Sequence, residues 1–136
     1  MVARFYDIDE ANATLNELES IATVLAEQRA ELVRLRDHAL ARSPGTGDDV
    51  EPLSDDELRT LRLRMQGLVD QMAAGVARID QLGLSLRDIE SGLVDFPALV
   101  AGRQVWLCWR RGEPQIGWWH DLDTGFSGRR PLSELA

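Results

Sequence analysis

The chain has 136 residues and a net charge of −8, with 23 acidic residues against 15 basic ones. This excess of negative charge repels nucleic acid and anionic membrane surfaces, so we expect neither as a partner. The single cysteine excludes an intramolecular disulfide. No apolar run approaches the roughly 18 residues that a membrane span requires, and we expect a soluble cytoplasmic protein.

The first half of the sequence predicts a long helix from Asp7 to about Ala41. Asp7 and Glu10 have the spacing of a capping box, in which each side chain accepts a hydrogen bond from the other residue's backbone amide. Apolar residues then recur at intervals of three, four or seven: Leu15, Leu18, Ala22, Leu25, Leu32 and Leu35. This period predicts one apolar stripe along the helix. The glycine-rich, acidic segment from Ser43 to Pro52 predicts a loop.

A second helix is predicted from Ser54 to Leu82, followed by Gly83 as its terminator. Ser54 and Glu57 form another capping box, flanked by Leu53 and Leu58 as a hydrophobic staple. An uninterrupted seam of alternating three- and four-residue steps follows: Leu58, Leu61, Met65, Leu68, Met72, Gly75, Ile79 and Leu82. Such a seam is typical of coiled-coil-like packing, so the two helices are predicted to form a long antiparallel hairpin.

Three apolar residues of the second helix lie off this seam, at Leu63, Val69 and Val76. A two-helix hairpin buries only one face of each helix, so these residues require another covering surface. The following segment can cover one end of the hairpin. A second copy of the chain is expected to cover the rest, which predicts a homodimer or larger assembly.

After Gly83 the apolar period changes from that of a helix to that of short strands. We expect a strand at Leu84 to Ile89, an extended piece at Leu93 to Pro97, and a hairpin with strands Arg103 to Arg110 and Gln115 to Leu122. Its four-residue loop, Arg111 to Pro114, would pair Leu107 with Trp118 and Cys108 with Gly117. This register places Cys108 on the face opposite His120.

These elements predict an α+β fold, with an antiparallel two-helix hairpin followed by a small antiparallel β-meander. The hairpin would take residues 1–82 and the β cap residues 83–136, and we expect both to fold as one unit.

Several segments resemble those of a known family. They are DEANATL at Asp9–Leu15, GLVDFPAL at Gly92–Leu99, LCWRRGEPQIGWWH at Leu107–His120 and GFSGRRPL at Gly125–Leu132. They are similar to the signature segments of domain of unknown function 2203, a family of bacterial proteins. The resemblance implies a two-helix part followed by a small β part, and implies no activity, substrate or cofactor.

The candidate ligand-binding residues are Asp95, Glu113, His120, Arg129 and Arg130. His120 lies beside two tryptophans, where a histidine can act as a base or as a metal ligand, or simply as a buried residue bonded to the backbone. Arg129 and Arg130 end a glycine-rich loop and could bind an anion. Alternatively, one of them pairs with Asp95 or Glu113 and fixes the loop. No catalytic residue and no metal ligand is assigned, because the predicted register separates Cys108 from His120.

Two functions are compatible with this sequence. The first is a non-enzymatic interaction or scaffold module that self-associates through its helices and can also bind a protein partner. The second is a small protein that binds an anionic ligand or a metal ion on the β cap, with possible hydrolase or redox activity. The long seam and the surplus apolar residues favour the first function.

Overall fold

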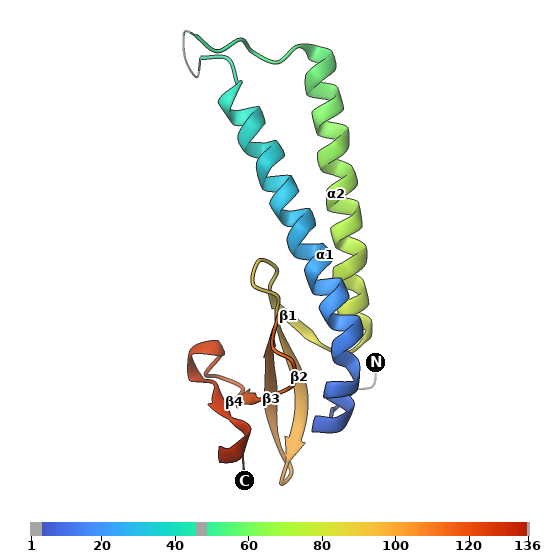
Figure 1. Ribbon diagram of the computed structural model, residues 1–136, viewed down its shortest axis with the longest axis vertical. Helices are drawn as coiled ribbons and strands as arrows, with labels where there is room; N and C mark the ends of the chain where they lie inside the picture. Colours follow the sequence, from blue (N-terminus) through green and yellow to red (C-terminus); the bar gives the residue numbers. More distant parts are fainter. Residues whose placement is uncertain (1–3, 46–48, 136) are drawn as a thin grey trace.

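The computed structural model describes residues 4–45 and 49–135. Two long helices form a hairpin, and a five-stranded antiparallel sheet packs against its lower half, so that the upper half projects alone (Figure 1). The prediction of a helical hairpin followed by a β-meander is confirmed. Within the described residues, neither helix carries an apolar stretch that could cross a membrane.

The helices begin where the capping boxes predict. Helix α1 spans Ile8–Ala41 and helix α2 spans Asp55–Gln81. The Asp7 carboxylate accepts a hydrogen bond from the Glu10 amide at 2.7 Å, and the Ser54 hydroxyl accepts one from the Glu57 amide at 3.1 Å. Both boxes are reciprocal, which satisfies amides that a helix otherwise leaves free in its first turn.

The segments that end and join the helices also follow the sequence. Gly83 follows the end of α2 with a φ of 77°, in the left-handed region that glycine adopts without strain. Between the helices, residues 43–45 and 49–54 form no helix or strand, as predicted. The rest of that predicted loop, residues 46–48, lies outside the described residues.

The sheet is a simple meander, with strands paired in chain order. Its strands are β1 (Ser85–Asp88), β2 (Leu93–Val100), β3 (Arg103–Arg110), β4 (Trp118–His120) and β5 (Arg130–Pro131). Strand β3 therefore lies at the centre. Two short 3-10 helices, Phe126–Gly128 and Leu132–Glu134, flank β5.

Strand β2 continues past Pro97, where the sequence predicts the extended piece to end. β1 pairs only with Leu93, Val94 and Asp95, so the outer edge of β2 is open to other partners beyond that point. Proline is tolerated at such an edge because it has no amide to contribute. The Pro97 carbonyl accepts a hydrogen bond from the Tyr6 amide at 2.7 Å, so the start of the chain covers this edge.

The predicted register of the second hairpin is wrong by one residue. Leu107 pairs with Trp119, and Cys108 pairs with Trp118 rather than with Gly117. Strand β4 is also shorter than the predicted Gln115 to Leu122. A shift of one residue moves every side chain of a strand to the opposite face of the sheet, so it changes which side chains can meet.

Two interactions of the connecting segment accompany this shift. Residues 111–117 form a seven-residue connection in which the Ile116 amide donates to the Asn12 side chain on α1 at 2.7 Å. The Glu113 carboxylate accepts from the Arg110 amide at 2.7 Å, and Pro114 has no amide to donate. These bonds attach Ile116 to α1 and Glu113 to the end of β3, and the regular ladder with β3 begins only at Trp118.

The core lies between the lower hairpin and one face of the sheet. Its members on the sheet side are Val94, Phe96, Ala98, Val105, Leu107, Trp109 and Trp119, and on the helix side Ala11, Leu15, Leu18, Ala22, Leu25 and Ile79. Tyr6 joins the two layers: its hydroxyl donates to the Leu82 carbonyl at 2.5 Å, and its ring lies edge-on to Phe96, with centroids 5.2 Å apart.

The helices approach closely at Gly75. A Cβ at this position would lie 2.9 Å from Cδ2 of Leu25, so the missing side chain makes room for this leucine. The seam glycine thus admits a bulky partner from α1.

Candidate functional site

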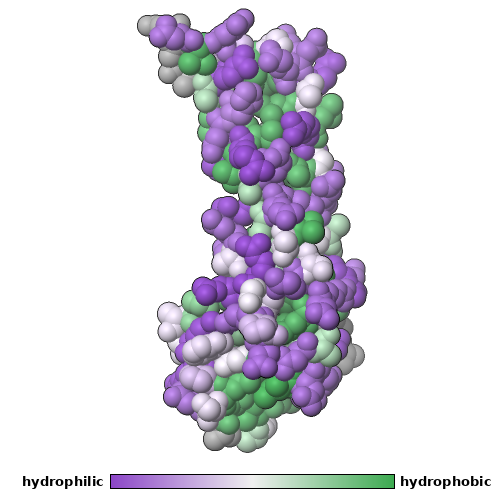
Figure 2. Space-filling view, viewed as in Figure 1, coloured by the Kyte–Doolittle hydropathy of each residue, from purple (hydrophilic) through white to green (hydrophobic). Residues whose placement is uncertain are grey.

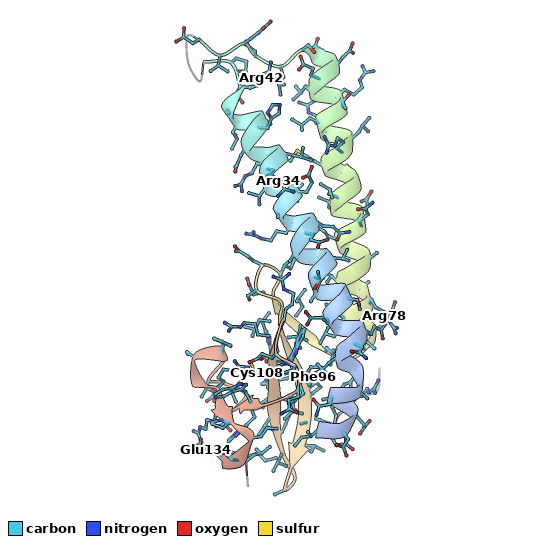
Figure 3. The ribbon with its side chains drawn as sticks, viewed as in Figure 1. Arg34, Arg42, Arg78, Phe96, Cys108 and Glu134 are labelled. Carbon is cyan, nitrogen blue, oxygen red and sulfur yellow. The ribbon has the colours of Figure 1, made fainter. Side chains whose placement is uncertain are left out.

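Three buried side chains meet on the sheet face that points away from the helices. Asp95 on β2 lies directly opposite Cys108 on β3, and His120 on β4 pairs with Trp106, two residues from Cys108. Side chains two residues apart on a strand share a face. Their exposed fractions are 2% for Asp95 and His120 and 0% for Cys108. Figure 3 labels Cys108 in the sheet, on the side of the C-terminal segment.

The prediction that Cys108 and His120 lie on opposite faces is wrong. One carboxylate oxygen of Asp95, the Cys108 sulfur and one His120 ring nitrogen all lie within 4.8 Å of one another. The one-residue register shift brings them together, because it moves His120 to the face that carries Cys108.

Hydrogen bonds fix the orientation of the His120 ring. Nδ1 lies 2.8 Å from the Asp121 carbonyl oxygen, and Nε2 lies 3.0 Å from Oδ2 of Asp95. A carbonyl oxygen can only accept, so Nδ1 carries a proton. Nε2 therefore is the nitrogen that faces the carboxylate.

Arg87 completes the polar cluster. Its Nε donates to Oδ2 of Asp95 at 2.9 Å, and its guanidinium lies 4.9 Å from the ring centroid of Trp106. Oδ2 thus has two partners, whereas Oδ1 of Asp95 is buried and has no hydrogen-bond partner among the described residues. A buried carboxylate oxygen without a partner is costly and calls for a reason.

The Cys108 thiol is chemically quiet in this environment. Burial, together with the nearby negative charge of Asp95, raises its pKa to about 12. A thiol in this state is not an activated nucleophile, because the thiolate is the reactive form.

Glu113 and Arg129 form a separate pair. Arg129 donates to both carboxylate oxygens of Glu113, at 2.9 and 3.1 Å, and to the Cys108 carbonyl at 3.1 Å. Its guanidinium also lies 4.8 Å from the Trp118 ring centroid and 4.7 Å from that of Phe126. These contacts attach the C-terminal segment to the sheet, which is the structural role considered for one of the two arginines.

Arg130 lies apart from both groups. It approaches the Asp121 carboxylate at 4.0 Å and lies 5.2 Å from the Trp119 ring centroid. The five predicted ligand residues are therefore divided among the Asp95–His120 pair, the Glu113–Arg129 pair and the more exposed Arg130.

A cavity of about 450 Å³ opens beside the Asp95–His120 pair. Arg87 and Leu93 form part of its wall, and the loop from Leu122 to Phe126 folds back over it. Asp95 and His120 thus are within reach of a small molecule or water, although almost none of their surface faces bulk solvent.

Sequence reasoning missed two members of this cluster, Arg87 and Cys108. For Cys108 the sequence does contain a signal that could have corrected its predicted face. Pro114 and Gly117 both disfavour a regular strand immediately after the turn. A longer loop would have placed Cys108 and His120 on one face. No comparable local signal points to Arg87, which lies at an irregular position of β1.

Comparisons with known proteins define the family. No curated protein and no solved structure matches the chain. The family model described as "Uncharacterized conserved protein (DUF2203)" matches residues 4–132, which include both helices and the whole sheet. The chain belongs to this family, as the resemblance of its segments implies.

Proposed function

We propose that the protein is a non-enzymatic interaction module that self-associates through its helical arm. The arm is the part of the hairpin beyond the sheet, residues 29–41 of α1 and 55–69 of α2. One observation carries the proposal: an apolar stripe that the sheet covers at the base of the hairpin continues uncovered along the arm.

The stripe is visible in seven-residue steps. Met72 and Val76 on α2 pack against the core. Met65 and Val69 precede them by seven residues and therefore lie on nearly the same side of the helix. They line a groove between the helices together with Leu32 and Val33. Val69 is 45% exposed, and Figure 2 shows apolar surface along the arm.

The groove begins where the sheet ends. Arg29 lines it, and the guanidinium of Arg29 lies 3.6 Å from the carboxylate of Glu90, in the turn between β1 and β2. The sheet and the uncovered groove are therefore neighbours along one face of the hairpin. A second copy of the arm would supply the layer that the sheet supplies at the base.

Charges at the groove are compatible with such an occupant. Of its arginines, Arg29 pairs with Glu90 and Arg36 with Asp37, at 3.6 and 3.1 Å. These pairs lower the repulsion between two arms that meet groove to groove, because two of the groove's three arginines, all but Arg62, are accompanied by a negative charge. Burial of the groove's apolar side chains would then stabilise the assembly by about 25 cal/mol for each Å² of apolar surface removed from water.

Sedimentation velocity over a range of concentrations tests this proposal. We expect a mass above the 15.2 kDa of the monomer at micromolar concentration. Val69→Glu should shift the protein to monomer by placing a charge in the groove. Leu63→Glu is the matched control. The sequence groups Leu63 with Val69 as residues that need a covering surface, but Leu63 is 67% exposed and does not line the groove, so this proposal leaves it outside the contact.

Two outcomes would contradict self-association through the groove. One is a parent protein that remains monomeric at every concentration. The other is dissociation by Leu63→Glu with no effect of Val69→Glu, which would assign the contact to another face of α2.

The cytoplasm is the compartment that we propose for this module. Cys108 is a free thiol, and reducing compartments keep thiols free. The net negative charge of the chain supports a protein partner over nucleic acid, because negatively charged phosphates would repel the chain.

The alternative function, a ligand site on the β cap, divides into two forms. In its anionic form it would use Arg129 and Arg130, but Arg129 is held by Glu113 and by the Cys108 carbonyl. In its metal form it is supported by a specific observation, the convergence of Asp95, Cys108 and His120.

A further inference from the structure

The buried cluster on the outer face of the sheet combines three kinds of metal-ligand atom. A carboxylate oxygen of Asp95, the sulfur of Cys108 and a ring nitrogen of His120 lie within 4.8 Å of one another. They come from three adjacent strands, β2, β3 and β4, so the hydrogen-bonded sheet holds their backbones in place. Sites built on such elements are more exact than sites on loops.

His120 is oriented as a metal ligand requires. Its Nδ1 proton is directed at the Asp121 carbonyl, at 2.8 Å. Nε2 points into the cluster toward Asp95, where the 3.0 Å contact with Oδ2 needs a proton between the two atoms, and a bound cation would take the place of that proton. A backbone carbonyl that binds the second ring nitrogen is a common way of orienting a metal-binding histidine.

Asp95 has a free oxygen at the same place. Arg87 binds Oδ2 at 2.9 Å and orients the carboxylate, whereas Oδ1 is buried without a hydrogen-bond partner. Asp95 is almost completely buried, with only 2% of its surface exposed. The cost of leaving this oxygen unpaired is explained if a cation binds it.

We propose that Asp95, Cys108 and His120 bind a divalent transition-metal ion of the zinc class. Zinc bonds to thiolate sulfur at about 2.3 Å and to imidazole nitrogen at about 2.0–2.1 Å. An ion placed among the three atoms reaches them after small rotations of the side chains. Metal binding releases the thiol proton of Cys108 to solvent. The resulting thiolate selects zinc and similar ions over magnesium and calcium, which prefer oxygen ligands alone.

The fourth coordination position would face the cavity. Asp95 and His120 line this space of about 450 Å³, and Cys108 does not line it. Three protein ligands with one open position are the arrangement of catalytic zinc sites, whereas structural sites have four protein ligands. The open position can hold a water molecule or an oxygen or nitrogen atom of a small ligand. This inference is independent of self-association through the arm.

Cobalt(II) is a suitable probe because its thiolate complexes have a charge-transfer band in the near ultraviolet. The parent protein, cleared of metal by a chelator, should bind one equivalent of Co²⁺ with this band and release it to Zn²⁺. Equilibrium dialysis with Zn²⁺ should give the same stoichiometry. Bound Zn²⁺ should also raise the melting temperature, since a ligand of the folded state stabilises it.

Three variants test the ligands. Cys108→Ser should lose the charge-transfer band, and Asp95→Asn and His120→Ala should weaken Zn²⁺ binding. Each loss should exceed the about 10–100-fold that removal of an outer-shell partner costs. His38→Ala is the matched control, because His38 is the only other histidine and lies on α1 near the tip of the arm. It should bind Co²⁺ as the parent does.

The parent protein alone can overturn the proposal, so it does not depend on variants that fold. A folded parent that binds neither Co²⁺ nor Zn²⁺ would make the Asp95–His120 contact a structural pair. Binding without the thiolate band, or binding that His38→Ala abolishes, would place the metal elsewhere.

Discussion

The base and the arm of the hairpin are held together by different interactions. At the base, α1 and α2 share a core with the sheet, and α1 alone buries five residues there, from Ala11 to Leu25. In the arm, α1 buries Leu35 and α2 buries Leu61. Ion pairs supplement this small core, with Glu31 joined to Arg64 at 2.9 Å and Arg42 to Glu57 at 3.6 Å.

This contrast shows that a continuous seam of apolar residues in the sequence does not produce a continuous core in the structure. The same three- and four-residue spacing runs through both regions, yet burial depends on a third layer that only the base possesses. Exposed ion pairs contribute at most about 1 kcal/mol each. The arm therefore depends on local helix stability, and on a partner where one binds.

The largest expected difference between the regions is in the cost of losing a core side chain. Phe96→Ala at the base should lower the free energy of unfolding by about 3–5 kcal/mol, because its ring is fully buried between sheet and helices. Leu61→Ala in the arm should cost about 2 kcal/mol, the lower limit for leucine, since a surface cavity beside it admits water. Urea denaturation measures both values.

The same experiment tests whether the two regions unfold as one unit. All four tryptophans lie between residues 106 and 119, so their fluorescence reports the β part, whereas helical circular dichroism reports mainly the hairpin. We expect the two signals to give one transition. Equal losses for both variants would contradict the contrast in packing, and separate transitions would contradict a single folding unit.

Glycines on α2 should give a smaller and opposite effect. Gly67→Ala should raise the free energy of unfolding by about 0.5–1 kcal/mol, because a Cβ there meets nothing within 4 Å and alanine favours the helix. Gly75→Ala is the matched comparison and should gain less or lose stability, since its Cβ would press on Leu25. A larger gain at Gly75 than at Gly67 would show that the helices are not closely packed there.

The smallest expected effect concerns pH at the tip of the arm. The Ser54 amide donates to the Glu57 carboxylate and lowers the pKa of Glu57 below its ordinary value of 4.5. A lowered pKa in the folded state stabilises the fold above the unfolded pKa, and this contribution is lost as the pH falls through the folded pKa. Protection of the first amides of α2 from hydrogen exchange should decrease over that acidic range.

Glu57→Gln should remove most of this pH dependence while it retains a side chain that can accept the bond. Asp88→Asn is the control at the base, because the pKa of Asp88 is lowered by its hydrogen bonds from Ser91. This change should leave the exchange of the α2 amides unaltered. An unchanged pH profile in Glu57→Gln would assign the effect to another group.

The helices could be predicted because their signals are local. Capping partners lie three residues apart, and the apolar period repeats along each helix, so neighbouring residues specify both limits. The boundaries of β3 are also local, set by the turn at Ala101 and Gly102 on one side and by Gly112 on the other. Both turn residues before β3 have positive φ, 52° and 77°, as tight hairpin turns require.

The cluster of Asp95, Cys108 and His120 could not be predicted in the same way. Its assembly depends on the register of β4, and the segment just before β4 is bonded to Asn12, which lies 104 positions from Ile116. Hairpin pairing rules consider only the loop and its two strands. The structure brings Asp95 and His120 into contact, whereas the assignment of Cys108 to the other face followed from a pairing one residue away from the observed register.

The two long-range hydrogen bonds of Tyr6 have a consequence for the order of folding during synthesis. Tyr6 binds the Leu82 carbonyl, 76 positions along the chain, and the Pro97 carbonyl further on. Contacts of such wide sequence separation close late, because the intervening chain must first lose its freedom. The ribosome makes Tyr6 before both of its partners, which emerge only with the end of α2 and with β2. The segment around Tyr6 is therefore fixed late, after the hairpin has formed from contacts that are nearer in sequence.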